Sequence, residues 1–134
     1  MPKENKCRTY FAIVGDFDPD MVSKRLGIDP YCAWKKDDLR KDGKPYGFAR
    51  WECGFCNEYD PMVTNMMEKT IEPLLGKTKE LNAIREENDV RFYLGVVPEF
   101  YIDTITPCVS PSLKVIDFAH ETRTEIDIDP YVYR

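Results

Sequence analysis

The chain has 134 residues, of which 43% are hydrophobic and 13% aromatic, a length and composition that suit one compact domain with its own core. Because disorder combines low hydrophobicity with high net charge, this composition excludes a disordered chain. The net charge of -5 also argues against a protein that lives on phosphate backbones, which needs a basic surface.

The first predicted elements are a strand and a helix. Residues 1–7 are predicted to form a flexible segment, followed by a single domain over 8–134. Residues 8–15 alternate with apolar side chains on both faces, which is typical of a central strand. Asp18 followed by Pro19 predicts a helix start, because aspartate caps a helix and proline suits its first position.

A long polar loop and a second strand come next. Residues 29–46 are rich in turn-forming pairs and mixed charge, and two aromatic residues, Tyr31 and Trp34, stand near the start of this loop. The second strand is predicted at about 47–54. Its alternation puts Trp51 on one side together with two smaller residues, Ala49 and Cys53.

The middle of the chain predicts a helix, a short helix and a strand. Asp60-Pro61 repeats the capping signal, and apolar residues at helical spacing follow as far as Leu74. Thr78 is expected to cap the short helix. The third strand is predicted at 90–97, closed by Pro98, with residues 100–106 continuing as an irregular strand.

The last predicted elements are a helix and a strand. Ser110-Pro111 predicts a helix with Leu113, Ile116 and Ala119 on one face, and the alternation over 125–129 predicts a strand with one buried and one wet face. The order of elements predicts an α+β sandwich, in which helices pack on a mixed or antiparallel sheet of at least four strands. The predicted core contains Phe11, Ile13, Trp51, Met66, Leu113 and Ile126.

The chain carries no signal for a membrane or for export. No window approaches the ~20 apolar residues of a membrane helix, and no stretch of signal-peptide length follows the N-terminus. We therefore expect a cytoplasmic protein with reduced thiols. The odd count of five cysteines agrees with this expectation, because it fits poorly with a disulfide framework.

Several short motifs along the chain resemble one bacterial family. They are Phe-Ala-Ile-Val-Gly at 11–15, Leu-Gly-Ile-Asp-Pro at 26–30, Trp-Lys-Lys at 34–36, Arg-Trp-Glu at 50–52, Glu-Pro-Leu-Leu at 72–75 and the segment 126–131. The family is known only as domain of unknown function 4279, and the resemblance covers roughly residues 8–133. It implies the fold and a bacterial or phage origin, and it carries over no catalytic residues, because the family has no established activity.

Cys53 and Cys56 form a C-x-x-C pair that could carry redox chemistry. In a thiol-disulfide oxidoreductase such a pair opens a helix, whose N-terminus lowers the pKa of the first thiol. Here the predicted helix starts at Pro61, which is too late to act on Cys56, so buried or incidental thiols are favoured. A zinc site would need two more ligands at suitable spacing, and the chain has a single histidine, His120. We predict no metal and no cofactor.

The long loop is the predicted binding segment. Loops of this length inside a compact domain are uncommon and often functional. Interleaved aspartates cancel much of its positive field, which favours a solvated loop over a nucleic-acid site. The predicted binding residues are Tyr31, Trp34, Lys35, Lys36 and Arg40.

The sequence favours a small non-enzymatic protein-interaction module, because it combines an acidic surface with no catalytic equipment. Neutralisation of a toxin is one form of that role. Two alternatives stay open: a thiol-disulfide oxidoreductase that uses Cys53 and Cys56, and a module that binds a small ligand or nucleic acid through the 31–50 region. We expect a protein partner and no membrane, and the sequence does not predict the oligomeric state.

Overall fold

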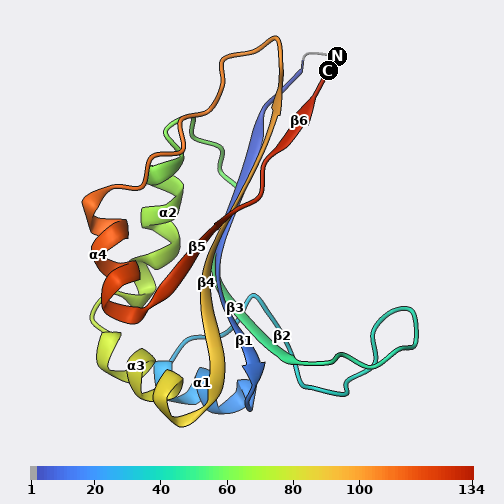
Figure 1. The fold of residues 1–134 in the computed structure, drawn as a ribbon, viewed down its shortest axis with the longest axis vertical. Coiled ribbons are helices and arrows are strands. Elements are labelled where there is room, and N and C mark those ends of the chain that lie inside the picture. The colour runs from blue at the N-terminus through green and yellow to red at the C-terminus, as the bar shows by residue number, and fades with distance from the viewer. Residues whose placement is uncertain (1–2) are drawn as a thin grey trace.

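A computed structural model describes residues 3–134 and shows a six-stranded sheet with helices packed on it (Figure 1). The strands are β1 (Lys6–Asp16), β2 (Cys32–Trp34), β3 (Ala49–Cys56), β4 (Asp89–Tyr101), β5 (Thr124–Ile128) and β6 (Tyr131–Tyr133). The helices are α1 (Pro19–Leu26), α2 (Val63–Ile71), α3 (Thr78–Glu87) and α4 (Leu113–Thr122), and a short 3-10 turn, η1 (Glu72–Leu74), follows α2.

The sheet is mixed, with the strand order β2-β3-β1-β4-β5. The strand predicted to be central, β1, lies between β3 and β4 and is antiparallel to both. At the other end β5 and then β6 run parallel to β4. The α+β class and the helix-on-sheet arrangement predicted from the sequence are therefore confirmed.

All the helices lie on one face of the sheet (Figure 1). The core fills the space between them and the sheet, and its largest fully buried side chains are Trp51, Phe11 and Phe92. Apart from Ala12, the buried residues of β1 alternate along the strand, and those of β3 alternate from Ala49 to Cys53, which is the pattern of a strand covered on one side. The opposite face of the sheet carries no helix.

Three helices begin close to the predicted prolines. Asp18 caps α1 by accepting a hydrogen bond from the backbone nitrogen of Asp20 at 3.0 Å. Helix α2 begins two residues after Pro61, at Val63, and Asp60 accepts from the nitrogen of Met62. The cap of α4 is Ser112 and not the predicted Ser110.

The predicted burial of Leu113 is wrong. Leu113 is the first residue of α4 and is 76% exposed, and Ile116 is 45% exposed. The helix instead turns the stripe that contains Val115 and Phe118 toward the sheet. Both stripes have helical spacing, so periodicity alone did not distinguish them. Thr78, predicted as a cap, is the first residue of α3, and Lys77 before it makes no side-chain cap.

Strand β4 is longer than predicted and runs through Pro98. This proline falls between the last residue paired with β5, Val96, and the first paired with β6, Glu99. A proline is tolerated there because it falls outside the residues that pair with β5 and with β6. Strands β2 and β6, with three residues each, were not predicted as separate strands.

The N-terminal segment joins the sheet early. β1 begins at Lys6, and the side chain of Asn5 donates to Thr104 and to the carbonyl of Ile105. The first two residues of the segment predicted to be flexible lie outside the described residues. No helix in the described part of the chain is long and apolar enough to cross a membrane.

Candidate functional site

One face of the sheet is covered by none of the described helices (Figure 1). Because directly opposed residues of neighbouring strands point to the same side, the register assigns a fixed set of side chains to this surface. We call it the open face; its members on β1 to β4 include Arg8, Tyr10, Ala12, Val14, Cys32, Trp34, Arg50, Glu52, Arg91, Tyr93, Gly95, Val97 and Glu99.

Tyr10 forms part of the open face because β4 has a glycine opposite it. The register pairs Tyr10 with Gly95, and a side chain on Gly95 would collide with the ring of Tyr10. The ring therefore lies flat against the backbone of β4. A flat, half-buried tyrosine of this kind presents apolar area without losing much side-chain entropy on binding.

Arg50 stands at the centre of a cluster of aromatic rings on the open face. Its guanidinium carbon lies 5.6 Å from the ring centroid of Tyr10 and 5.9 Å from that of Trp34, both within the range of a cation–π interaction. Its Nε donates to the carboxylate of Glu52 at 3.1 Å. Trp34 in turn stacks on Tyr46, with ring centroids 4.2 Å apart. We call Tyr10, Trp34, Tyr46 and Arg50 the aromatic–arginine cluster.

Residues 35–48 form a projecting arm between β2 and β3. Figure 1 shows it leaving the sheet on the side opposite the helices. The arm is a hairpin: Tyr46 donates its backbone N–H to Asp38 and accepts from that of Asp37, and the nitrogen of Arg40 donates to Lys44. The indole of Trp34 donates to the carbonyl of Phe48 at 3.2 Å and so joins the base of the arm to the cluster.

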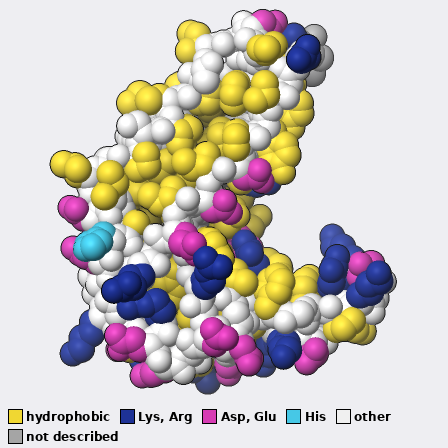
Figure 2. Space-filling model, viewed as in Figure 1, with side chains coloured by type: hydrophobic (Ala, Val, Ile, Leu, Met, Phe, Trp, Pro, Cys, Tyr) yellow, Lys and Arg dark blue, Asp and Glu magenta, His cyan; other side chains and the backbone are white. Residues whose placement is uncertain are grey.

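The arm is basic although the whole chain is acidic. Five of the 19 basic residues lie within residues 35–44. Two of them are ion-paired, Lys35 with Asp20 at 3.1 Å and Arg40 with Asp42 at 3.3 Å. Lys36, Lys41 and Lys44 make no salt bridge to any described residue. Figure 2 shows Lys and Arg side chains gathered at the tip of the arm.

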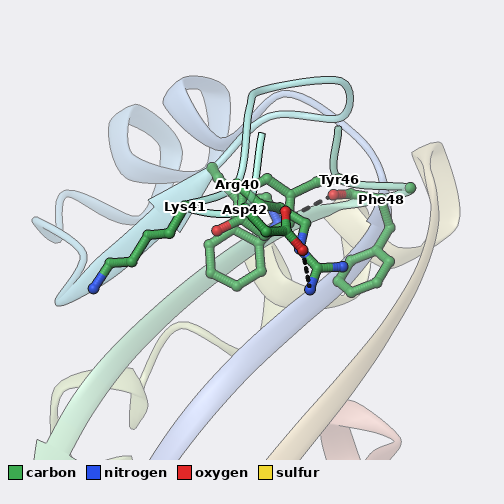
Figure 3. A pocket seen from close by; sticks show the side chains of 7 residues that line it. Arg40, Lys41, Asp42, Tyr46 and Phe48 are labelled. Atoms are coloured by element: carbon green, nitrogen blue, oxygen red, sulfur yellow. Dashed lines mark hydrogen bonds and ion pairs between the residues drawn. The ribbon is translucent and has the colours of Figure 1, made fainter. Parts of the chain in front are cut away.

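A pocket of about 510 Å³ opens between the arm and its base. Figure 3 shows the side chain of Arg40 turned toward Asp42 and Phe48, whereas Lys41 extends away from the pocket. The residues that line the pocket combine aromatic and charged groups: Trp34, Arg40, Lys41, Asp42, Tyr46, Gly47 and Phe48. Such a mixture can hold a flat or apolar group and an anionic group side by side.

The structure separates the predicted binding residues into two groups. Trp34 and Arg40 line the same pocket. Lys35 is tied to Asp20, whose hydrogen bond and charge raise the pKa of this lysine. Tyr31 lies apart and stacks on Phe55, with ring centroids 4.4 Å apart.

Three important residues of this surface were missed in the sequence, namely Tyr10, Arg50 and Tyr46. The first two belong to strands, and alternation assigns them to the face opposite Phe11 and Trp51, but it does not predict that this face is left uncovered. That Tyr46 folds back onto Trp34 depends on the arm closing as a hairpin, which the sequence of the arm does not reveal.

Cys53 and Cys56 lie in β3 and are buried. Burial, together with the charge of Glu52, raises the pKa of Cys53 to about 12. The next helix, α2, begins only at Val63, so no helix N-terminus stabilises a thiolate. All five cysteines are free thiols. This geometry offers no activated thiol to the oxidoreductase alternative.

Metal-ligating side chains do not gather in the described part of the chain. Among residues 3–134, no group of three or more His, Cys, Asp or Glu side chains is placed to hold a metal ion. His120, the single histidine, lies in the last turn of α4.

A second exposed surface is apolar and lies on the helix side. Figure 2 shows a broad hydrophobic area above the base of the arm. Exposed apolar residues of α4, of the loop before it and of the β5–β6 end of the sheet include Ile102, Ile105, Leu113, Ile116, Ile128 and Val132. We call them the apolar patch. It carries no arginine and no stacked rings, which distinguishes it from the open face.

The comparisons with known proteins identify one family. A family model described as "Domain of unknown function (DUF4279)" matches residues 5–133, which is nearly the whole chain. No curated protein and no solved structure matches.

Proposed function

The chain belongs to the DUF4279 family, and we propose that it is a non-enzymatic protein-interaction module whose partner covers the open face and the arm. The observation that carries this proposal is the one-sided packing of the sheet. All the helices lie on one face, and the other face presents an organised cluster of aromatic and arginine side chains to solvent. Exposed surfaces of this composition are commonly interaction sites.

The residue types of the aromatic–arginine cluster support protein binding. Tyrosine, tryptophan and arginine are the side chains that most often carry the binding energy of protein interfaces. Here they are already held in place, because Trp34 stacks on Tyr46 and Arg50 is bound to Glu52. A partner would therefore find them in one conformation, which lowers the entropy cost of association.

The arm adds a second contact surface and a positive charge. It projects from the sheet beside the cluster, so a partner in this corner would touch both surfaces (Figure 1). Its basic tip stands out from an acidic chain. Such a local charge steers a partner of opposite charge during encounter and raises the association rate.

Photocrosslinking in the cells that produce the protein tests the proposal. A photoreactive amino acid replaces Phe48, which is 42% exposed at the base of the arm. The matched control replaces Ile116, which is 45% exposed on α4. We expect one protein to crosslink from position 48 and not from position 116. A partner that crosslinks only from position 116 would assign the interface to the apolar patch and contradict the proposal.

Neutralisation of a toxic protein is the more specific form that we propose for this role. The test is co-expression of the crosslinked partner with the parent chain or with Trp34→Ala. We expect the parent to restore growth and the variant to restore less of it. A partner that is harmless when expressed alone would exclude the neutralising role and leave the binding role intact.

A further inference from the structure

Resting on the function proposed above, we propose that the partner presents an acidic segment, and that Arg50 binds a carboxylate of this segment in the corner between the open face and the arm. Arg50 is the one arginine of the open face that lies between two aromatic rings. The proposal names the chemistry of the partner, which the exposed face alone does not.

The side chain of Arg50 is held in one position by its neighbours. The rings of Tyr10 and Trp34 flank its guanidinium, and its Nε is fixed by Glu52. The side chain is only 21% exposed, so its position is defined by its neighbours rather than by solvent. A guanidinium fixed in this way pays little entropy when a ligand binds, in contrast to a free surface arginine.

The terminal nitrogens of Arg50 remain available to a ligand. Glu52 contacts Nε, and no hydrogen bond joins Nη1 or Nη2 to any residue in the described range, 3–134. A guanidinium carries five N–H donors, and its two Nη groups form a fork that matches the two oxygens of a carboxylate. Partial burial beside aromatic rings strengthens this hydrogen bond relative to one in open water.

The charge of Glu52 reduces the attraction of Arg50 for an anion, and the arm compensates for it. Lys36, Lys41 and Lys44 are free of salt bridges to the described residues. Two of the three aspartates of the arm are engaged locally: Asp38 accepts from the backbone of Lys35, and Asp42 accepts from that of Lys44 and pairs with Arg40. With five basic and three acidic residues over 35–44, the arm keeps a positive net charge beside the corner.

The surroundings favour a short acidic protein segment over a nucleic acid. Beyond the corner the charges of the same face are mostly paired: Glu99 on β4 with Arg8, and Glu125 on β5 with Arg91. A long polyanion that tracked across the face would gain little from these paired charges, and the chain as a whole has a net charge of -5. A segment with its carboxylates confined to the corner needs only Arg50 and the lysines of the arm.

Nuclear magnetic resonance titration of the full chain tests the proposal with a defined probe. The probe is a tetraglutamate peptide capped at both ends, and its matched control is the corresponding tetraglutamine peptide. We expect saturable shifts of the Arg50 Nε–H and of the Trp34 indole N–H with the acidic peptide only. Shifts that are absent, or that spread equally over the lysines of the helices, would overturn the proposal.

Variants of Arg50 test whether this side chain binds a carboxylate of the peptide. Arg50→Gln should weaken the apparent affinity about tenfold, the effect of losing a charge-assisted hydrogen-bonded pair. Arg50→Lys should weaken it too, because lysine keeps the charge but lacks the fork. The charge control is Lys114→Gln on α4, which should stay within about twofold of the parent. Parental affinity in both Arg50 variants would overturn the proposal, and the titration of the parent decides it even if a variant misfolds.

A third probe separates the two kinds of anion. A capped oligothymidylate that moves the same resonances at a lower concentration than the acidic peptide would overturn the acidic-segment proposal in favour of a nucleic acid. Failure of the peptide titration leaves the crosslink from position 48 unaffected. Conversely, an absent crosslink would refute the proposed function even when the peptide binds, so the two failures are distinguishable.

Discussion

The side chain of Trp51 connects the sheet to helix α1. It is the largest of the fully buried side chains. Its indole Nε1 donates to the hydroxyl of Ser23 on α1 at 2.9 Å, so the one polar atom of the side chain is satisfied inside the core. The other tryptophan, Trp34, lies on the opposite face and is only half-buried. The two therefore serve different purposes, one in stability and one in the proposed interface.

Substitution of Trp51 by alanine is the strongest test of the core. We expect Trp51→Ala to lower the free energy of unfolding by about 3–5 kcal/mol, because it leaves a large cavity and removes the hydrogen bond to Ser23. Trp34→Ala is the matched control and should cost about 1 kcal/mol, the value of an exposed aromatic pair. Urea denaturation followed by circular dichroism measures both. Equal losses in the two variants would contradict this division of roles.

The thiols of Cys53 and Cys56 should behave as core residues. Burial raises the pKa of Cys53 to about 12, so near neutral pH almost none of it is the reactive thiolate. The exposed Cys108 is an internal control in the same chain. We expect iodoacetamide to label Cys108 first and Cys53 only on unfolding, as read by mass spectrometry. Rapid labelling of Cys53 or Cys56 near pH 6 would revive the oxidoreductase alternative.

Single residues were predictable where a strand pattern decided their side. Trp51 alternates with the polar Arg50 and Glu52 and is buried as predicted. Phe11 and Ile13 are buried as predicted too, although their strand carries apolar residues on both faces. Met66 is buried as well. Leu113 failed because α4 turns the stripe of Val115 and Phe118 toward the sheet, and Leu113 lies outside this stripe. The position of a side chain within its helix mattered more than its hydrophobicity.

At the scale of elements, a glycine sets how closely α2 approaches β3. Gly54 adopts a left-handed conformation with φ 70°. A side chain there would collide with the backbone oxygen of Thr70 on α2, and the hydroxyl of Thr70 donates to the carbonyl of Gly54 at 2.7 Å. Thr70 also shares a hydrogen bond with Thr9 of β1. Glycine at this position therefore allows one helix to contact two strands through a single threonine.

Gly54→Ala should destabilise the protein by more than the conformational cost alone. Gly27 is the matched control: it has φ 66°, yet a side chain there would meet nothing within 4 Å. We expect Gly27→Ala to cost about 1 kcal/mol and Gly54→Ala about 2–4 kcal/mol, because only the second adds a steric clash. Thermal unfolding of both variants measures the difference. Similar costs would mean that α2 moves away from β3 without penalty.

The longer elements were predictable from local signals, and the shortest ones were not. Asp18-Pro19 and the alternation around Trp51 are self-contained, so α1 and β3 follow from their own residues. β2 and β6 have three residues each and exist because β3 and β4 offer them an edge. Strands of this kind depend on pairing with distant residues, which no local pattern encodes.

At the scale of the whole molecule, the candidate site results from the chain order of the strands and helices. The sequence predicted helices packed on a sheet, but not that every helix would take the same face. That arrangement exposes Tyr10, Trp34 and Arg50 together although they come from three strands. The aromatic entry to the loop was predicted, whereas Arg50 was not, because its role depends on rings from β1 and β2.

The arm should be dispensable for folding, because it contributes nothing to the core. No residue of 35–48 is buried. The backbone nitrogen of Tyr46 donates to the carbonyl of Asp38, and in a four-residue turn the nitrogen of the last residue donates to the carbonyl of the first in the same way. Replacing residues 39–45 by Asn-Gly keeps this bond and supplies a turn that matches the twist of the strands. We expect the melting temperature to change by less than about 3 °C, since surface segments without buried contacts contribute little.

The same variant should lose the charge of the arm while keeping the cluster at its base. It removes Arg40, Lys41 and Lys44 and leaves Trp34, Tyr46 and Arg50 in place. If the arm steers an acidic partner, association of the shortened chain should become slower and less sensitive to salt, whereas dissociation should change little. Stopped-flow mixing of the tetraglutamate peptide with either chain at increasing salt measures this effect. Unchanged association at low salt, in a variant that melts like the parent, would show that the basic tip has no part in recognition and that the anion is bound by the sheet alone.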